Sequence, residues 1–170
     1  MSGWGDVVGD TALTIKVLEA DALVRAGFPA HVTVLYPFLH ESAIDGGVRR
    51  ALVEIFGAYD AFELGFGAFA RYPGVLYLQP EPHHLVRRLT EALVGRWPEA
   101  VPYRGVFGGE GLEPHLTVAN SEGPSTWRAA YDALERELAP ELPVVTKVRE
   151  VQLIVWDGAR WRDRAAYALR

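Results

Sequence analysis

The amino-acid sequence predicts an α+β fold in which a single domain, residues 1–170, contains two similar lobes. Three observations support this prediction. Short segments of alternating apolar and polar residues indicate strands, and longer segments with apolar residues three or four positions apart indicate amphipathic helices. These segments follow one another in the same order in both halves of the chain. A length of 170 residues, 49% of them hydrophobic, is typical of one domain with a sizeable core.

Five elements are expected in the first half of the chain. In order, they are strands over 11–18 and 30–36, a helix over 44–59, and strands over 62–69 and 74–79. The first strand alternates apolar residues with Thr14 and Lys16, which predicts one buried and one exposed face. Pro37 ends the second strand. The turn at 72–74 contains Pro and Gly, so the last two strands are expected to form a hairpin.

The second half is expected to repeat this order. Its elements are a helix over 82–97, a loop over 98–114, a strand over 115–119, a helix after Ser125, and strands over 148–156 and 160–169. Ser125 is a candidate N-cap for the second helix. The last two strands are expected to form a hairpin around Asp157-Gly158. The loop contains four glycines, and long loops in compact domains are often functional.

A weak internal duplication connects the two halves. His31 begins a strand that is followed by a helix and two strands, and His115 begins the same succession. Phe69 lies 38 positions after His31, and Leu153 lies 38 positions after His115. Two strand-helix-strand-strand units of similar spacing predict two lobes related by a pseudo-two-fold axis.

Composition excludes several classes of function. A formal net charge of -5 argues against binding to long duplex nucleic acid, which requires a basic surface. The chain has no cysteine, so disulfides and cysteine-ligated zinc are excluded. No apolar run is long enough to cross a membrane, and the N-terminus does not resemble a signal peptide. A cytoplasmic monomer that does not bind membranes is the expectation.

The strongest functional signal is a repeated four-residue motif, His-x-Thr-Val, over 31–34 and 115–118. Each copy begins a predicted strand, in which side chains alternate between faces. His31 and Thr33 therefore share one face, as do His115 and Thr117, while the valines point into a core. A single copy would be better explained as an ordinary strand with a hydrogen-bonded histidine. Two copies at equivalent points of a duplicated unit favour a shared site.

The paired motifs suit phosphoester chemistry. Cleavage of a phosphodiester or a cyclic phosphate requires a base that activates water and an acid that protonates the leaving oxygen. Histidine serves both roles near neutral pH. The hydroxyl groups of Thr33 and Thr117 can donate hydrogen bonds to the charged non-bridging oxygens. This chemistry requires neither a metal nor another cofactor, so none is expected.

The motifs resemble those of the two-histidine (2H) phosphoesterases, also known as the 2'-5' RNA ligase-like superfamily, which includes RNA cyclic phosphodiesterases. The matching stretches cover 29–38, 74–78, 102–103 and 114–119, and order and spacing agree from about Thr11 to Trp156. The resemblance implies two antiparallel sheets flanked by helices, with a central cleft that carries one His-x-Thr motif from each lobe. It also implies that His31, Thr33, His115 and Thr117 are catalytic, and that 2',3'-cyclic phosphates, 2'-5' linkages or small cyclic nucleotides are substrates.

One departure from the family pattern concerns the substrate. RNA cyclic phosphodiesterases often have a basic residue soon after the second motif, whereas this chain has Ala-Asn-Ser-Glu over 119–122. The resemblance therefore does not specify an RNA end. Tyr103 is a candidate for stacking on a base, and packing is an equal alternative. His83 and His84 lack a third metal ligand at a suitable spacing, so a surface position is expected.

These observations predict a metal-independent phosphoesterase that hydrolyses a 2',3'-cyclic phosphate on a nucleotide or a short RNA end. The reverse reaction, a 2'-5' RNA ligation, would use the same groups. A non-catalytic module that binds a nucleotide or RNA end in the same cleft is the main alternative, and two intact motifs argue against it. A metal-dependent hydrolase is a third alternative, which a chelator would inhibit.

Overall fold

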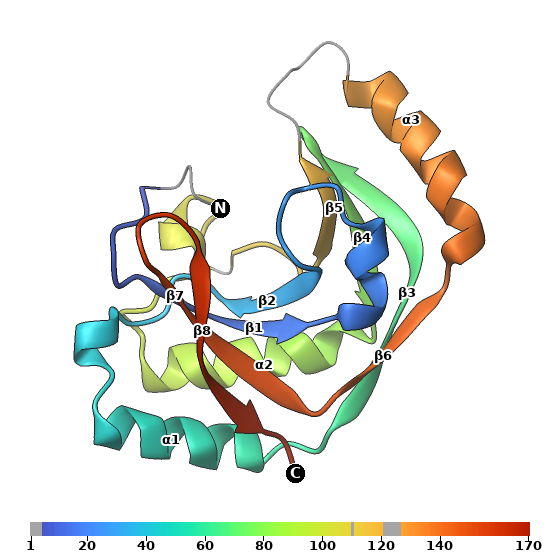
Figure 1. The fold of residues 1–170 in the computed structure, drawn as a ribbon. Helices are drawn as coiled ribbons and strands as arrows, with labels where there is room; N and C mark the ends of the chain where they lie inside the picture. The colour runs from blue at the N-terminus through green and yellow to red at the C-terminus, as the bar shows by residue number, and fades with distance from the viewer. Residues whose placement is uncertain (1–4, 110, 121–126) are drawn as a thin grey trace.

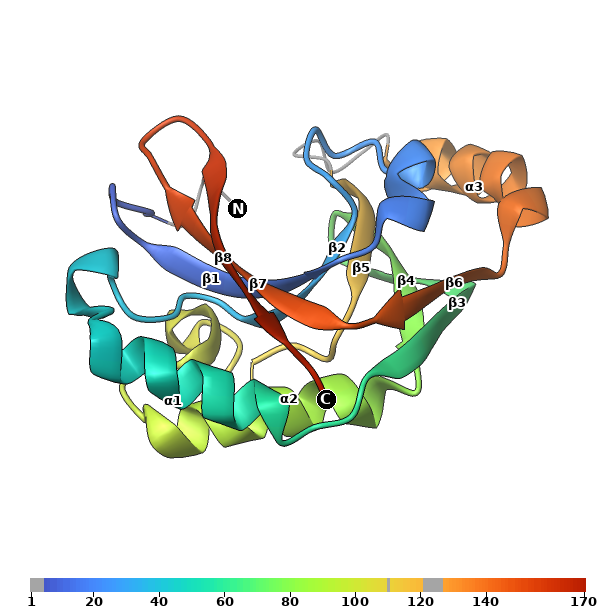
Figure 2. The same ribbon diagram turned by 60° about the horizontal axis from the view of Figure 1, so that its bottom comes forward.

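The computed structural model describes residues 5–109, 111–120 and 127–170. Within these residues, eight strands form two four-stranded antiparallel sheets flanked by three α-helices, which confirms the predicted α+β class (Figures 1 and 2). The first sheet has the order β2 (His31–Leu35), β1 (Thr11–Lys16), β7 (Glu150–Trp156), β8 (Trp161–Ala168). The second has the order β5 (Leu116–Asn120), β4 (Val75–Glu81), β3 (Phe62–Tyr72), β6 (Val144–Val148).

The helices cover the outer faces of the two sheets. α1 (Gly46–Gly57) and α2 (His83–Arg96) lie together against the first sheet, where α1 contacts β8 and α2 contacts β2 (Figure 2). α3 (Trp127–Leu138) lies along the second sheet, where Tyr131 donates from its hydroxyl to the carbonyl oxygen of Gly74 over 2.8 Å. The helix expected after Ser125 is therefore present, although Ser125 itself lies outside the described residues. In the described part of the chain, no helix is both long and apolar enough to span a membrane.

Each of the two sheets combines strands from both halves of the chain. β3, from the first half, pairs with β6, and β7, from the second half, pairs with β1. The repeated units thus exchange strands, because β3 crosses to the second sheet after α1, and β7 crosses to the first sheet after β6. The continuous strand expected over 148–156 is wrong at its start, since β6 ends at Val148 in the second sheet and β7 begins at Glu150 in the first.

β1 is buried on both faces, which corrects its expected half-exposed pattern. Thr11 and Thr14 are buried because each hydroxyl has a backbone partner: Thr11 donates to the carbonyl oxygen of Leu39 over 2.5 Å and Thr14 to that of Val32 over 3.2 Å. The strand ends at Lys16, two residues earlier than expected, and a 3-10 helix over Leu18–Leu23 follows it.

Candidate active site

The two His-x-Thr motifs lie on neighbouring edge strands. β2 is an outer strand of the first sheet and β5 is an outer strand of the second, and the two strands are in contact (Figure 1). His31, Thr33, His115 and Thr117 are all partly exposed, whereas Val32, Leu116 and Val118 are buried. His115 directly precedes β5 rather than belonging to it. The alternation thus holds one imidazole and one hydroxyl per motif on the accessible face.

Both imidazoles are anchored in the same way. Nδ1 of His31 donates to the carbonyl oxygen of Pro29 over 2.9 Å, and Nδ1 of His115 donates to that of Glu113 over 2.8 Å. Because a carbonyl oxygen only accepts, we assign the ring proton to Nδ1 in both neutral histidines. Each Nε2 is then an acceptor when the ring is neutral and a donor when it is charged, so it can serve as base or acid.

The surroundings of the two rings favour their neutral forms. Burial lowers the pKa of His31 and of His115, and the carbonyl contacts oppose this effect in part. A charge on His115 lowers the pKa of His31 further, so the two rings are close enough to influence each other. Protonation of both rings at once is therefore disfavoured relative to a single proton on the pair.

Aromatic rings surround the histidines. The ring of Phe28 lies 5.2 Å from that of His31, and the rings of Tyr72 and Tyr77 lie 5.7 and 5.6 Å from that of His115. Burial raises the pKa of Tyr72 to about 12, so this hydroxyl remains a hydrogen-bond donor at neutral pH. The sequence pattern does not reveal that these rings surround the histidines. Tyr77 is opposite Thr117 in the β4–β5 register, a pairing that strand alternation alone does not reveal.

Lys16 is a cation beside the first motif that the sequence pattern did not single out. It is opposite His31 in the β1–β2 register, and directly opposed residues of antiparallel strands point to the same face. Its Nζ lies 2.6 Å from Oδ2 of Asp163 on β8. In the family pattern, by contrast, the expected basic residue follows the second motif. There, β5 ends at Asn120, and Ser121 and Glu122 lie outside the described residues.

Tyr103 lies in a strained turn beside Thr33. Tyr103 and Arg104 have φ angles of 51° and 53°, in the left-handed region that side chains rarely adopt. Tyr103 is 9% exposed, and its ring packs edge-on against those of Tyr36 and Phe107, with centroids 5.8 and 5.6 Å away. Its hydroxyl interacts with the Thr33 side chain, and burial raises its pKa. The structure therefore brings Tyr103 to the motif, with most of its ring already packed.

Arg104 connects this turn to Tyr36, which follows β2, and to the segment before β1. Its guanidinium lies over the Tyr36 ring, 5.4 Å from the centroid, and donates to the Tyr36 hydroxyl over 2.8 Å. It also pairs with Asp10 over 2.8 Å and with Asp6 over 3.4 Å, while the Tyr36 hydroxyl donates to Asp6. We call Asp6, Asp10, Tyr36 and Arg104 the arginine anchor. It holds the start of the Gly-rich loop against β2.

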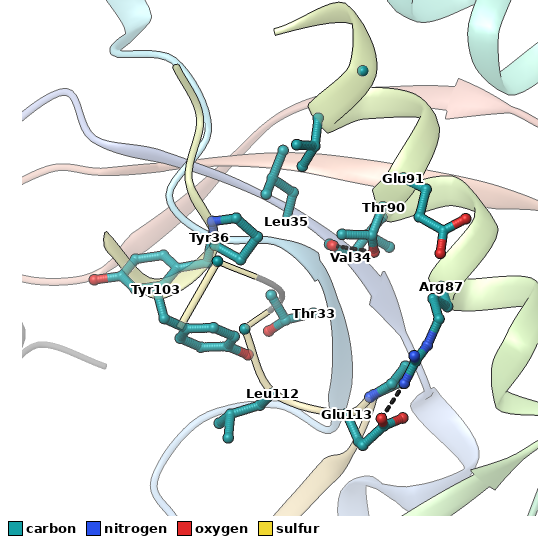
Figure 3. A pocket seen from close by; sticks show the side chains of 16 residues that line it. Thr33, Val34, Leu35, Tyr36, Arg87, Thr90, Glu91, Tyr103, Leu112 and Glu113 are labelled. Carbon is teal, nitrogen blue, oxygen red and sulfur yellow. Dashed lines mark hydrogen bonds and ion pairs between the residues drawn. The ribbon is translucent and has the colours of Figure 1, made fainter. Parts of the chain in front are cut away.

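A cavity of about 460 Å³ lies next to Thr33 (Figure 3). Its walls are residues 33–35 of β2 with the following Tyr36, one side of α2, and parts of the loop before His115. Neither motif histidine lines it, so it extends away from them along the edge of β2. An ion pair between Arg87 and Glu113 lies at one side of the cavity (Figure 3).

The other histidines have different surroundings. His83 is exposed and lies 3.8 Å from Glu81 and 4.0 Å from Glu113. His40 bonds to the Ser42 hydroxyl and to the carbonyl oxygen of Val8, over 2.8 and 2.9 Å, within a loop. Across residues 5–109, 111–120 and 127–170, no three His, Asp or Glu side chains are grouped so that they could hold a metal ion.

Comparisons with known proteins agree with this architecture. Residues 14–160 match the family model of the 2'-5' RNA ligase superfamily. No curated protein matches the chain in sequence. Among solved structures, E. coli LigT in complexes with NADP+ and with 3'-AMP is similar, each with a TM-score of 0.59 and 16% identity over 96% of this chain and 99% of LigT.

A third solved structure, TT0787 of Thermus thermophilus, has a TM-score of 0.60 and 18% identity over 95% of this chain and 98% of its own. At these identities the likenesses show a shared fold. The family model covers most of the sequence and includes both His-x-Thr motifs. The chain therefore belongs to the 2'-5' RNA ligase superfamily, which comprises the 2H phosphoesterases and related ligases.

Proposed function

We propose that this protein hydrolyses a 2',3'-cyclic phosphate, on a nucleotide or at a short RNA end, to a phosphomonoester without a metal ion. The matched anchoring of His31 and His115 carries this proposal, because it leaves one Nε2 at the start of each of two neighbouring edge strands for proton transfer. The complexes of E. coli LigT with 3'-AMP and NADP+ support a nucleotide as the ligand class.

The proposed reaction moves two protons. Nε2 of the neutral histidine accepts a proton from water as the water oxygen bonds to phosphorus. Nε2 of the charged histidine donates its proton to the ribose oxygen as the P–O bond breaks. Thr33 and Thr117 donate hydrogen bonds to the non-bridging oxygens, where negative charge accumulates. Attack by the 5'-hydroxyl of a second RNA end, in place of water, would give the ligation by the same proton transfers.

A substrate panel tests the proposal. The purified protein is incubated with 2',3'-cyclic nucleotides, RNA ends carrying a cyclic phosphate, and 2'-5' dinucleotides, each with EDTA present. We expect a phosphomonoester from the cyclic phosphates, at a rate that EDTA does not change. Loss of activity with EDTA would indicate a metal-dependent hydrolase. Binding without any product would indicate the non-catalytic nucleotide-binding module.

A further inference from the structure

We propose that the cavity beside Thr33 binds the uncharged nucleobase of the substrate, so that the enzyme acts on nucleotides in preference to a bare sugar phosphate. This inference rests on the proposed function and assigns a second part of the same site. Thr33 belongs to both parts, because it shares a strand face with His31 and also lines the cavity. A phosphate at Thr33 would therefore place its attached nucleoside at the mouth of the cavity.

The size of the cavity fits this ligand. Small-molecule sites generally measure about 300–1,000 Å³ and are largely apolar, with a few polar groups that fix orientation. At about 460 Å³, the cavity lies in the lower part of that range. This is suitable for a base with part of its ribose, and it is small for a dinucleotide.

The strand edge presents an apolar wall to the cavity. An extra residue, Val34, interrupts the pairing between β1 and β2, so the edge of β2 is irregular at this point. Two of its carbonyl oxygens are already used: that of Val34 accepts from Thr90 Oγ1 over 2.6 Å, and that of Tyr36 accepts from the Tyr103 amide over 2.6 Å. Val94 on α2 and Leu112 on the loop add apolar surface. A flat ring gains favourable contact with such walls.

The charged groups of the cavity favour a base over a second phosphate. One guanidinium, Arg87, lines the cavity together with two carboxylates, Glu91 and Glu113. Arg87 already pairs with Glu113, so the lining has an excess of negative charge. A carboxylate repels phosphate but accepts hydrogen bonds from the N–H groups on the edge of a base. An RNA chain is therefore not expected to continue through this cavity.

Cavity-filling variants test the inference. Val94→Phe on α2 and Leu112→Trp on the loop reduce the space from two different elements, while Val53→Phe places a phenyl ring at an exposed position of α1 as a control. We expect each filling variant to raise KM for 2',3'-cyclic nucleotides about 10-fold, with kcat within about twofold. KM for ribose 2',3'-cyclic phosphate, which has no base, should stay within about twofold. Val53→Phe should leave both values unchanged.

A binding experiment separates this inference from the proposed function. In the inactive His31→Ala/His115→Ala protein, calorimetry with adenosine 2',3'-cyclic phosphate should show about 10-fold weaker binding after Val94→Phe or Leu112→Trp. Binding of inorganic phosphate should not change. Thermal unfolding of each variant checks that it folds. If the cavity-filling variants preferred the cyclic nucleotide over ribose 2',3'-cyclic phosphate as strongly as the parent protein does, the proposal that the cavity binds the nucleobase would be overturned. Absence of turnover on every substrate would instead count against the proposed function alone.

Discussion

His31 and His115 have equivalent hydrogen bonds and interact electrostatically with each other. Burial lowers the pKa of each, and a charge on His115 lowers the pKa of His31 further. Because two charged rings repel each other, the pair favours one charged and one neutral ring near its pKa values. In the proposed reaction, the neutral ring is the base and the charged ring is the acid, and the orientation of the substrate determines which histidine takes each role.

The pH dependence of the rate follows from these directions. A histidine with a lowered pKa becomes neutral at a lower pH, so the base is available below the ordinary value of about 6.5. The acid also loses its proton at a lower pH. We expect a bell-shaped profile of kcat/KM whose maximum lies on the acidic side of about 6.5. Initial rates with a cyclic nucleotide over a range of buffers measure it, and a maximum in the alkaline range would contradict the lowered pKa values.

Removal of either imidazole tests the paired mechanism. A general acid or base contributes about 10²–10⁴ in rate, so His31→Ala and His115→Ala should each lose about that factor in kcat. The double variant should lose little more, because the two groups act in one coupled step. Single-turnover rates on a cyclic nucleotide check this. Retention of activity by either single variant, with the substrate shown to bind, would mean that the histidines are not a pair.

The threonines are expected to contribute less than the histidines. Thr33→Val and Thr117→Val keep the shape of the side chain but remove its hydrogen-bond donor. We expect kcat to fall about 10-fold to 10²-fold for each, with melting temperatures close to that of the parent protein. Stopped-assay kinetics and thermal unfolding provide the two measurements. A loss in kcat as large as that of the histidine variants would indicate a different role for the hydroxyl groups.

At the scale of elements, the arginine anchor holds the Gly-rich loop in place. Two successive residues with positive φ cost about 1–3 kcal/mol each, so Tyr103 keeps this conformation only while its surroundings stabilise it. Gly111, with a φ of +73°, brings the loop back against Pro102, where an added Cβ would lie 2.8 Å from the Pro102 Cβ. The turn and the loop are therefore closely fitted to each other and to β2.

Loss of the anchor should affect the site from a distance. Arg104→Gln removes the ion pairs with Asp6 and Asp10 and leaves their charges without this partner. We expect KM for a cyclic nucleotide to rise about 10-fold, because Tyr103 is no longer held beside Thr33 and the cavity, with a smaller change in kcat. Arg104→Lys should restore part of the loss. Arg88→Gln, at an exposed position of α2, is the control and should change nothing. Parent-like KM in Arg104→Gln would show that the anchor does not position Tyr103.

β2 illustrates how far the sequence can predict this fold. Alternation predicted the strand, its buried valines and the shared face of His31 and Thr33. Continued alternation would place Tyr36 on the face opposite to His31. The extra residue at Val34 shifts the alternation of faces by one position. Val34 and Leu35 therefore both enter the main core, while Tyr36 packs with Ala12 and Tyr103. A bulge depends on the partner strand, which local periodicity does not describe.

Long-range pairing limited the other predictions in the same way. The order of strands was predicted except for β6, but the sequence did not show that β3 and β7 cross to opposite sheets. Tyr72 and Tyr77 were missed as neighbours of His115 because their position depends on the register of β3, β4 and β5. The motif pair was predictable because the His and Thr of each copy lie two positions apart at the start of a strand, where this spacing determines the face.

At the scale of the whole molecule, the charge pattern limits the substrate. The net charge is -5, and many of the basic side chains have acidic partners. The described ion pairs include Lys16–Asp163, Arg71–Asp132, Arg71–Glu135, Arg104–Asp10, Arg162–Asp157 and Arg164–Glu41. A phosphate that binds one of these cations must compete with a carboxylate. Contacts to a long RNA backbone therefore gain little free energy.

RNA length should consequently have little effect on activity. Each phosphate of a single strand that is bound by a cation contributes about 0.7 to the slope of log affinity against log salt. We expect a cyclic-phosphate dinucleotide and a 20-nucleotide RNA with the same end to have KM values within about threefold, and a salt slope of about one. Kinetics at several salt concentrations with both substrates measure this, and a matched RNA with a linear phosphate end is the control for binding to the chain alone. A KM that falls steeply with length, or nanomolar binding to generic duplex at physiological salt, would show that the protein contains a nucleic-acid surface beyond the terminal nucleotide.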